Sequence, residues 1–193
     1  MLFKSEAAVL ANAKREIAEI IRQNNATTVC FSGHRSQKLP WGFDENDSRC
    51  LAVKQTLRQE IEAAVKNGYD TFLSGMALGF DMMCAEIVLE LKKTYPSIHL
   101  IGVIPCKNQD RKWPRQQKKR YHSLLKQIDG IRCIYECYNG SACMMERNRY
   151  MINHASLLIA LYDGQSGGTH FTVDYATRCG LKVVIIPPTQ DEE

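Results

Sequence analysis

The sequence predicts an α/β protein, a single Rossmann-like domain with a mainly parallel sheet and helices on both faces. Six short apolar runs show little alternation of polar and apolar residues, which is typical of strands buried on both faces. Helical patterns separate these runs, and alternation of strands with helices indicates a parallel sheet. Gly68, Gly130 and Gly180 each lie where a helix should end before the next strand begins.

Each element follows from its own local pattern. The expected strands are the apolar runs, in chain order 27–32, 71–74, 98–104, 131–135, 156–162 and 182–186. The expected helices have apolar residues at helical spacing and cover 48–66, 80–93, 113–127, 144–154 and 169–179. For example, Met83, Ile87 and Leu91 recur every four residues on one face. We expect a further helix over 1–24, the Rossmann-like domain over 25–189 and a short tail over 190–193.

Composition limits the classes of protein to consider. A chain of 193 residues is long enough for one domain with a sizeable core. A hydrophobic content of 45% and a charged content of 24% are ordinary for a soluble globular protein. The net charge of +4 is mild, and the basic residues cluster only in Lys107–Arg120. This charge by itself does not indicate nucleic acid.

The cysteine pattern and the absence of long apolar runs indicate the reducing cytoplasm. No run has the length of a membrane span, and we expect no membrane partner. Of the eight cysteines, Cys30, Cys84 and Cys133 fall inside expected strands or helices, where they act as small hydrophobic residues. Cys133, Cys137 and Cys143 lack the CxxC spacing and the paired histidines of a zinc site, so no metal is expected. No cofactor is expected either. The sequence leaves a homo-oligomer open.

The strongest functional signal follows the fifth expected strand. The strand 156–162 passes through a glycine-rich turn directly into a helix. Such a turn lets the backbone approach an anion, and the helix start offers unpaired N–H groups and the positive end of its dipole. We therefore expect a phosphate-binding loop formed by Asp163, Gly164, Gly167, Gly168 and Thr169.

Two further strands end in similar chemistry, and all these loops should lie at the carboxyl edge of the sheet, where ligands bind in such folds. The candidate ligand-binding residues in them are Gly33, His34, Arg35, Ser74, Gly75, Gly79 and Asp81. A glycine in one loop could serve only the turn, but three such loops on one edge favour an anion-binding cleft. The sequence lacks GxGxxG after its first strand and GxxxxGK[ST] elsewhere, which argues against ordinary NAD(P) binding and against an NTPase.

Four of the charged or polar candidate residues each allow two possible roles. Arg35 and Arg147 are candidates for phosphate contacts because a guanidinium binds two phosphate oxygens at once; the alternative is a surface salt bridge. Asp81 either contacts a ribose or only stabilises the start of a helix. His34 either contacts the ligand or bonds to the backbone.

Aromatic residues also allow two interpretations. Trp41 and Phe43 either cover the cleft and stack on a base or form a local hydrophobic plug. The run Lys107–Tyr121 is either a DNA-binding strip or a solvated helix start with Trp113 and Tyr121 packing inward, and we favour the latter. His99, His122 and His154 are interpreted as structural.

Several ordered motifs resemble one known family. FSGHR, KLPWG, SGMALGFD, ERNRYM and SGGTHFTVDYA are similar to segments of the SLOG superfamily of Rossmann-like nucleotide-binding proteins, and most similar to its YpsA-like branch. The resemblance covers roughly Thr27–Pro188. It implies a nucleotide-like small molecule as the ligand.

Two other branches of the superfamily suggest alternative functions. LOG-type phosphoribohydrolases cleave the N-glycosidic bond of nucleoside monophosphates and carry an arginine, which Arg147 matches, and a glutamate, whose place Thr172 occupies. The remaining candidates for catalysis are Asp81 and Glu146, together with Arg147. The resemblance therefore implies binding or sensing first and hydrolysis of a nucleotide second.

The third branch is the DprA-type protein, which binds single-stranded DNA. Its SGxAxGID, RNRI and SGxxxTAxxA segments resemble 74–81, 147–150 and 166–176 of this chain. A DNA channel needs a basic stripe with stacking aromatic residues, and only Lys107–Tyr121 offers one. Nucleic acid is therefore a less favoured partner than a small nucleotide.

Overall fold

The computed structural model describes residues 25–188. The helix expected over 1–24 and the tail expected over 190–193 lie outside the described residues. Six parallel strands form one sheet in the order β4-β3-β2-β1-β5-β6. In chain order they are β1 Thr28–Gly33, β2 Thr71–Ser74, β3 His99–Cys106, β4 Gly130–Tyr135, β5 Leu157–Leu161 and β6 Lys182–Ile186. The predicted Rossmann-like fold with a parallel sheet is confirmed.

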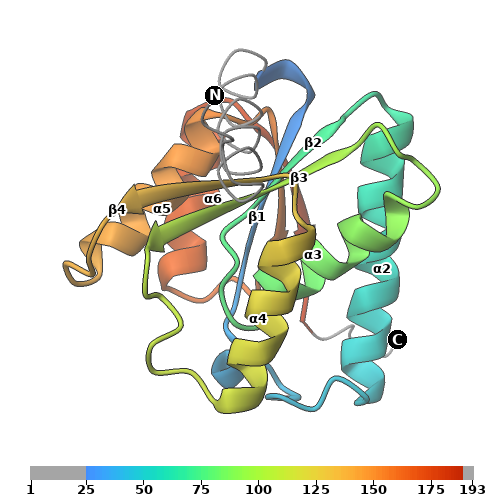
Figure 1. Ribbon diagram of the computed structural model, residues 1–193. Helices are drawn as coiled ribbons and strands as arrows, with labels where there is room; N and C mark the ends of the chain where they lie inside the picture. The colour runs from blue at the N-terminus through green and yellow to red at the C-terminus, as the bar shows by residue number, and fades with distance from the viewer. Residues whose placement is uncertain (1–24, 189–193) are drawn as a thin grey trace, which may run out of the picture.

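Helices cover both faces of this sheet (Figure 1). They are α2 Ser48–Lys66, α3 Phe80–Leu91, α4 Arg115–Gln127, α5 Ala142–Asn153 and α6 Gly168–Arg178, with 3-10 turns η1 Asn25–Thr27 and η2 Ser36–Lys38. One buried cluster joins α2, α3 and α4 to the sheet, and includes Leu57, Val88 and Leu124. A second cluster, which includes Met151 and Ala176, joins α5 and α6 to the other face.

The helix expected from Trp113 begins two residues later, at Arg115, with Pro114 as its N-cap residue. The ring of a proline disfavours the helical conformation in the residue before it, which excludes Trp113 from the helix. The helix expected to reach Lys93 ends at Leu91. There the N–H of Lys93 bonds to the carbonyl of Glu90, the tighter spacing at which α-helices often finish.

The strand order explains where a ligand can enter. From β1 the chain proceeds through β2 and β3 to β4 on one side, and α5 then returns it to β5 on the other side of β1. The loops after β1 and β5 therefore diverge toward opposite faces of the sheet. Such a switch point leaves a crevice at the carboxyl ends of the two strands, where α/β proteins bind ligands.

Candidate functional site

A cavity of about 310 Å³ lies at this switch point. The loop after β1, the loop after β2, the first two turns of α5 and the start of α6 surround it. Its lining residues are Phe31, Ser32, Gly33, His34, Arg35, Gln37, Lys38, Ala77, Asp81, Met144, Arg147, Asn148, Gly167, Gly168 and Thr169. The structure thus brings together sequence-predicted residues from four separate segments, and we call this space the first cavity.

The start of α6 forms one end of the first cavity. The first N–H groups of an α-helix have no carbonyl partner within the helix, and the helix dipole makes this end positive. Space above Gly168 is open, because a methyl group built there would touch no atom within 4 Å. A methyl group on Gly167 would lie 3.8 Å from Nζ of Lys38. An ammonium group and a helix start therefore face the same space.

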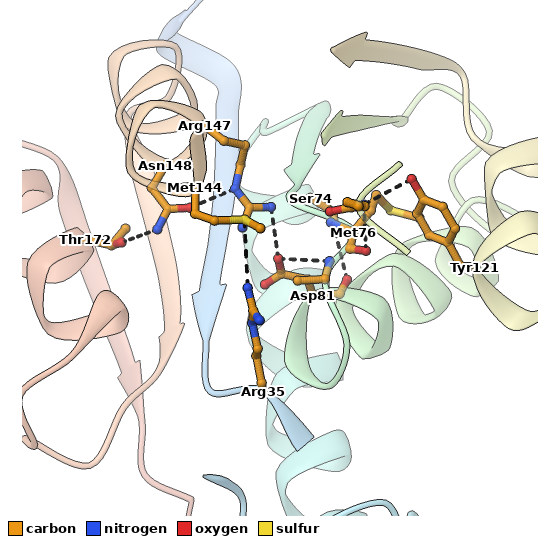
Figure 2. Close-up of polar contacts among 11 residues, drawn as sticks. Arg35, Ser74, Met76, Asp81, Tyr121, Met144, Arg147, Asn148 and Thr172 are labelled. Carbon is orange, nitrogen blue, oxygen red and sulfur yellow. Dashed lines mark hydrogen bonds and ion pairs between the residues drawn. The ribbon is translucent and has the colours of Figure 1, made fainter. Parts of the chain in front are cut away.

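A buried ion pair forms the floor of the first cavity. Nη1 of Arg147 lies 3.4 Å from Oδ2 of Asp81, and both side chains are only 7% exposed. Nε of Arg147 donates to Oδ1 of Asn148 at 2.8 Å. A methyl group on Gly75 would lie 1.5 Å from Nη1 of Arg147, so only glycine there lets the arginine reach Asp81. Figure 2 shows this pair between α5 and the loop after β2.

The charges in this region do not cancel. Burial lowers the pKa of Arg147, which Asp81 partly offsets, and the nearby positive charge of Arg35 lowers it further. Burial raises the pKa of Asp81, although Arg147 favours its ionised form. Arg35 points toward Arg147, and its Nη2 lies 3.8 Å from the sulfur of Met144 (Figure 2). Two guanidinium groups thus lie near one carboxylate, and of the two only Arg147 forms an ion pair with it.

Three predicted residues support the wall and do not line the cavity. The hydroxyl of buried Ser74 donates to the carbonyl of Asp81 at 2.8 Å and accepts the N–H of Met76. Gly75 leaves room for Arg147, as described above. Gly79 has a φ of 89°, and a methyl group there would lie 2.7 Å from the backbone N of Ser36. These residues therefore position Asp81 and the loop after β1.

His34 lines the first cavity, and its Nε2 lies 3.0 Å from Oδ1 of Asp163. The side chain thus bonds to a carboxylate rather than to the backbone, and it joins the loop after β1 to the loop after β5. The N–H of Gln165 and the bond to His34 together hold the pKa of Asp163 below its usual range. Asp163 and Gly164 lie beside the cavity without lining it, and Gly164 has a φ of 85°, which suits the turn.

The other candidates lie away from the cavity. Glu146 pairs with Arg149 at 2.7 Å and does not line it. Trp41 is buried in the core, which matches the hydrophobic-plug alternative, and Phe43 is 45% exposed. Neither of these aromatic residues lines the first cavity.

The predicted inward packing of the second aromatic pair is confirmed. Tyr121 is 1% exposed, and the ring of Trp113 meets it edge-on with centroids 5.2 Å apart. His122 faces Asp110 at 3.0 Å.

Sequence reasoning missed Gln37, Lys38, Met144 and Asn148 in the lining. Lys38 and Gln37 follow the predicted Arg35 directly in the same loop, and Asn148 follows Arg147, so proximity in sequence was the available signal. Nδ2 of Asn148 donates to the hydroxyl of Thr172 at 2.8 Å. That hydroxyl donates to the carbonyl of Gly168. Asn148 and Thr172 therefore connect α5 to the first turn of α6.

Residues 25–188 contain neither a side-chain cluster suited to a metal ion nor a helix suited to a membrane. No group of three histidine, cysteine, aspartate or glutamate side chains in this range is arranged to hold a metal ion. No helix of the described residues is long and apolar enough to cross a membrane. All eight cysteines fall in the described range, and all are free.

The fold and the cavity define a Rossmann-like protein with a positively charged cavity at the switch point of its sheet. The family model described as the YspA SLOG family matches residues 29–182, and this chain belongs to that family. A UPF0398 protein of Halalkalibacterium halodurans is 29% identical over 142 residues, which cover 73% of this chain and 75% of the relative. The SPbeta prophage-derived protein YoqJ of Bacillus subtilis is 35% identical over 143 residues, 68% of this chain and 84% of the relative.

Two solved structures share the fold. DNA processing protein A of Helicobacter pylori, which has a single-stranded DNA binding mode, superposes with a TM-score of 0.60 at 21% identity. The alignment covers 90% of this chain and 71% of that chain. DprA of Streptococcus pneumoniae gives a TM-score of 0.58 at 18% identity, over 86% of this chain and 52% of that chain.

Proposed function

We propose that this protein binds a nucleotide or nucleotide derivative through a phosphate in the first cavity. The observation that carries the proposal is the excess of positive charge around that space. Arg35, Lys38 and Arg147 line it together with the start of α6, while Asp81 is the one carboxylate among the described lining residues. Neither Arg35 nor Lys38 has an ion pair with any residue in 25–188. A phosphate would supply the missing negative charge.

Each part of the cavity would have its own role. The N–H groups of the first turn of α6 and the ammonium of Lys38 would hold the phosphate. Arg35, which is exposed, would bind it from the other side. The hydrogen bonds of Asp81 from Arg147 and Ala77 both use Oδ2. This leaves Oδ1 to accept a hydroxyl of the sugar.

Binding is favoured over catalysis by the positions of the carboxylates. Cleavage of an N-glycosidic bond needs a group that stabilises charge developing only in the transition state. Thr172 stands where the related hydrolases have a glutamate, and Glu146 pairs with Arg149 outside the cavity. The carboxylate of Asp81 already forms an ion pair with Arg147. The cationic groups would hold a phosphate equally in the ground state and the transition state.

Single-stranded nucleic acid is the second candidate ligand. Arg111 and Lys112, both exposed, lie beside Trp113 next to the first cavity, and basic residues with an aromatic ring are typical of single-strand binding. The likeness to the DNA processing protein A structures is one of fold, so it adds no residue-level support.

The test is a titration of the pure protein with AMP, GMP, CMP and UMP by calorimetry and thermal shift. A ligand present at one hundred times its Kd stabilises the folded protein by about 2.7 kcal/mol, and a thermal-shift measurement detects this increase. The deciding variant is Gly168→Asp, which places a carboxylate where the phosphate would lie. Gly168 has open space above it and no positive φ, so the variant should fold.

Gly168→Asn is the matched control, because it has nearly the same shape without the charge. We expect Gly168→Asp to lower nucleotide affinity by about a hundredfold and Gly168→Asn by far less, since charge repulsion adds to any steric effect. Unchanged affinity in a folded Gly168→Asp protein, or no binding of any nucleotide by the wild type, contradicts the proposal.

A further inference from the structure

A second cavity of about 650 Å³ adjoins the first. Arg35, Gln37 and Met144 line both, so the two spaces meet at these three side chains. The rest of the second cavity is formed by the segments that follow β3 and β4, namely 108–109, 111–114 and 137–138, together with Leu78. The carboxyl edge of the sheet thus carries a continuous pair of cavities, from α6 across Arg35 to the loop after β4.

The second cavity has a fixed aromatic wall. The ring of Trp113 packs edge-on against the buried ring of Tyr121. Nε2 of Gln109 donates to the carbonyl of Met76 at 3.2 Å and lies 3.1 Å from the hydroxyl of Tyr121. These contacts hold the turn before α4, so the indole is already positioned. Tyr138 also lines the cavity and is 65% exposed. A planar base can stack on such rings.

The second cavity is also positively charged. Arg35, Arg111 and Lys112 line it, and no acidic residue of 25–188 does. Within residues 25–188, Arg111 and Lys112 have no ion pair. With Lys38 and Arg147 from the first cavity, five cationic side chains face the joined space opposite one carboxylate. This net positive charge is larger than a single phosphate group would neutralise.

The positive charge does not continue as an open stripe along the basic run. Lys107 pairs with Glu136 at 2.5 Å, and Nζ of Lys118 donates to the backbone carbonyl of Arg111 at 2.9 Å. Arg120 is bonded to two glutamates. Three basic residues of the run are therefore occupied by the protein itself. The pattern favours a ligand that ends within the two cavities over a long strand.

We propose that the two cavities form one site for a dinucleotide, meaning two nucleosides bridged by phosphate. The inference rests on the proposed function and extends it. One phosphate lies at the start of α6, and the bridge crosses Arg35. The second base stacks on Trp113, with Arg111 and Lys112 neutralising the bridging phosphates.

The experiment compares four probes on the whole protein by calorimetry: AMP, diadenosine diphosphate, a 5′-phosphorylated 3′–5′-linked adenylyl dinucleotide, and a thymidine strand of about 20 nucleotides. We expect at least one of the two dinucleotides to bind about tenfold or more tightly than AMP, because its second half gains contacts without a second loss of translational freedom. The two dinucleotides distinguish a free diphosphate ligand from the end of a strand.

Charge reversal locates the second half of the ligand. We expect the double variant Arg111→Glu with Lys112→Glu to lower dinucleotide affinity by about tenfold or more and AMP affinity by less than about threefold at physiological salt, where screening limits distant effects. The matched control is Arg115→Glu with Lys119→Glu, since both residues are exposed in the same basic run and neither lines the first or the second cavity. The control should bind every probe like the wild type.

Tryptophan fluorescence gives an independent measurement. The chain has two tryptophans, and Trp41 is buried in the core away from both cavities. Stacking on Trp113 should therefore quench part of the emission, and Trp113→Phe should abolish the quenching.

Three results would overturn the inference. Dinucleotides that bind no more tightly than AMP reject the second half-site while the proposed function stands. Tight binding of the long strand with no preference for dinucleotides over AMP favours nucleic acid instead. If neither AMP nor a dinucleotide binds, the proposed function and this inference both fail.

Discussion

Two clusters of charged side chains, one around Arg120 and one around Arg147, differ in how many carboxylates accompany their cationic groups. Around Arg120, Nε lies 2.6 Å and Nη2 2.5 Å from the two carboxylate oxygens of Glu86, and the guanidinium also bonds to Glu45. Lys54 pairs with Glu45 at 2.6 Å. Two cations thus meet two carboxylates, and the cluster ties the loop before α2 to α3 and α4. The positive and negative charges of this cluster therefore cancel without a ligand.

Around Arg147 the balance differs. Arg147, Arg35 and Lys38 face one cavity, and Asp81 is the one acidic side chain lining it within the described residues. The Arg35 guanidinium has the sulfur of Met144 as its polar contact. A cluster that only stabilises a fold has no reason to gather uncompensated positive charge, because repulsion costs stability. The comparison separates structural arginines from arginines arranged for an anion, and it can be tested by mutation.

The largest effect on stability is expected from Arg147→Leu. This change leaves the buried carboxylate of Asp81 without its partner, which typically costs about 3–5 kcal/mol in the free energy of unfolding. Urea denaturation measures it. The double variant Asp81→Asn with Arg147→Leu should recover a substantial part of the loss, because no unpaired charge remains buried. Equal losses in the single and double variants would contradict this account.

The same variant should show a characteristic dependence on pH. Burial already raises the pKa of Asp81, and loss of Arg147 should raise it further. A carboxyl group with a raised folded-state pKa favours the protonated form in the folded protein, so the penalty grows as pH rises above the unfolded value. The deficit of Arg147→Leu should therefore be smaller at about pH 5 than at about pH 8.

A smaller loss is expected from Arg120→Met in the balanced cluster. The partly buried pair contributes about 1–2 kcal/mol, since some solvent screens it. Burial alone would raise the pKa of Glu45, but bonds from Arg120 and Lys54 lower it below its usual range. Its contribution is therefore present above the ordinary carboxyl pKa and lost as pH falls, so wild type and variant should converge in acid. AMP affinity should stay the same, and a large loss of affinity would blur the distinction between the clusters.

The smallest effect on stability is expected from Arg35→Gln. The side chain is exposed and has no ion pair within residues 25–188, so the free energy of unfolding should change by less than about 0.5 kcal/mol. The variant also removes the repulsion between Arg35 and Arg147, which would offset a loss of stability. AMP affinity should nevertheless fall about tenfold or more, since a charged contact to phosphate is lost. Calorimetry and urea denaturation on one preparation measure both quantities, and a stability loss as large as that of Arg147→Leu would contradict the assignment.

Local patterns predicted most of the fold. The apolar run 71–74 and the amphipathic run 48–66 coincide with β2 and α2, because the pattern that forms each element lies within it. The order of strands was not predictable in the same way, because it depends on where α5 returns the chain. Trp113 lay outside its expected helix for a local reason, since Pro114 follows it.

The site was predictable to the level of its loops but not of every side chain. Arg147 was expected to contact phosphate, and it lines the cavity; its pairing with Asp81, which needs the bare backbone of Gly75, was not foreseen. Such a fit depends on three segments far apart in the sequence. Lys38 was overlooked because it follows no strand directly, although a short turn, η2, brings it to the start of α6.

The last prediction concerns chemistry, where no activity is expected. Incubated with AMP, GMP, CMP or UMP, the wild type should release no more free base, measured by chromatography, than the Arg35→Gln variant does. The buried hydroxyl of Thr172 accepts a hydrogen bond from Asn148 and donates to the carbonyl of Gly168, so this side chain joins α5 and α6. Thr172→Glu would place an unpaired carboxylate in that buried position, and we expect it to destabilise the protein rather than create a hydrolase. Rapid base release by the wild type that is lost in Arg35→Gln would show that the cavity catalyses as well as binds. In that case Asp81 would be the carboxylate to replace next, because it already lies in the lining.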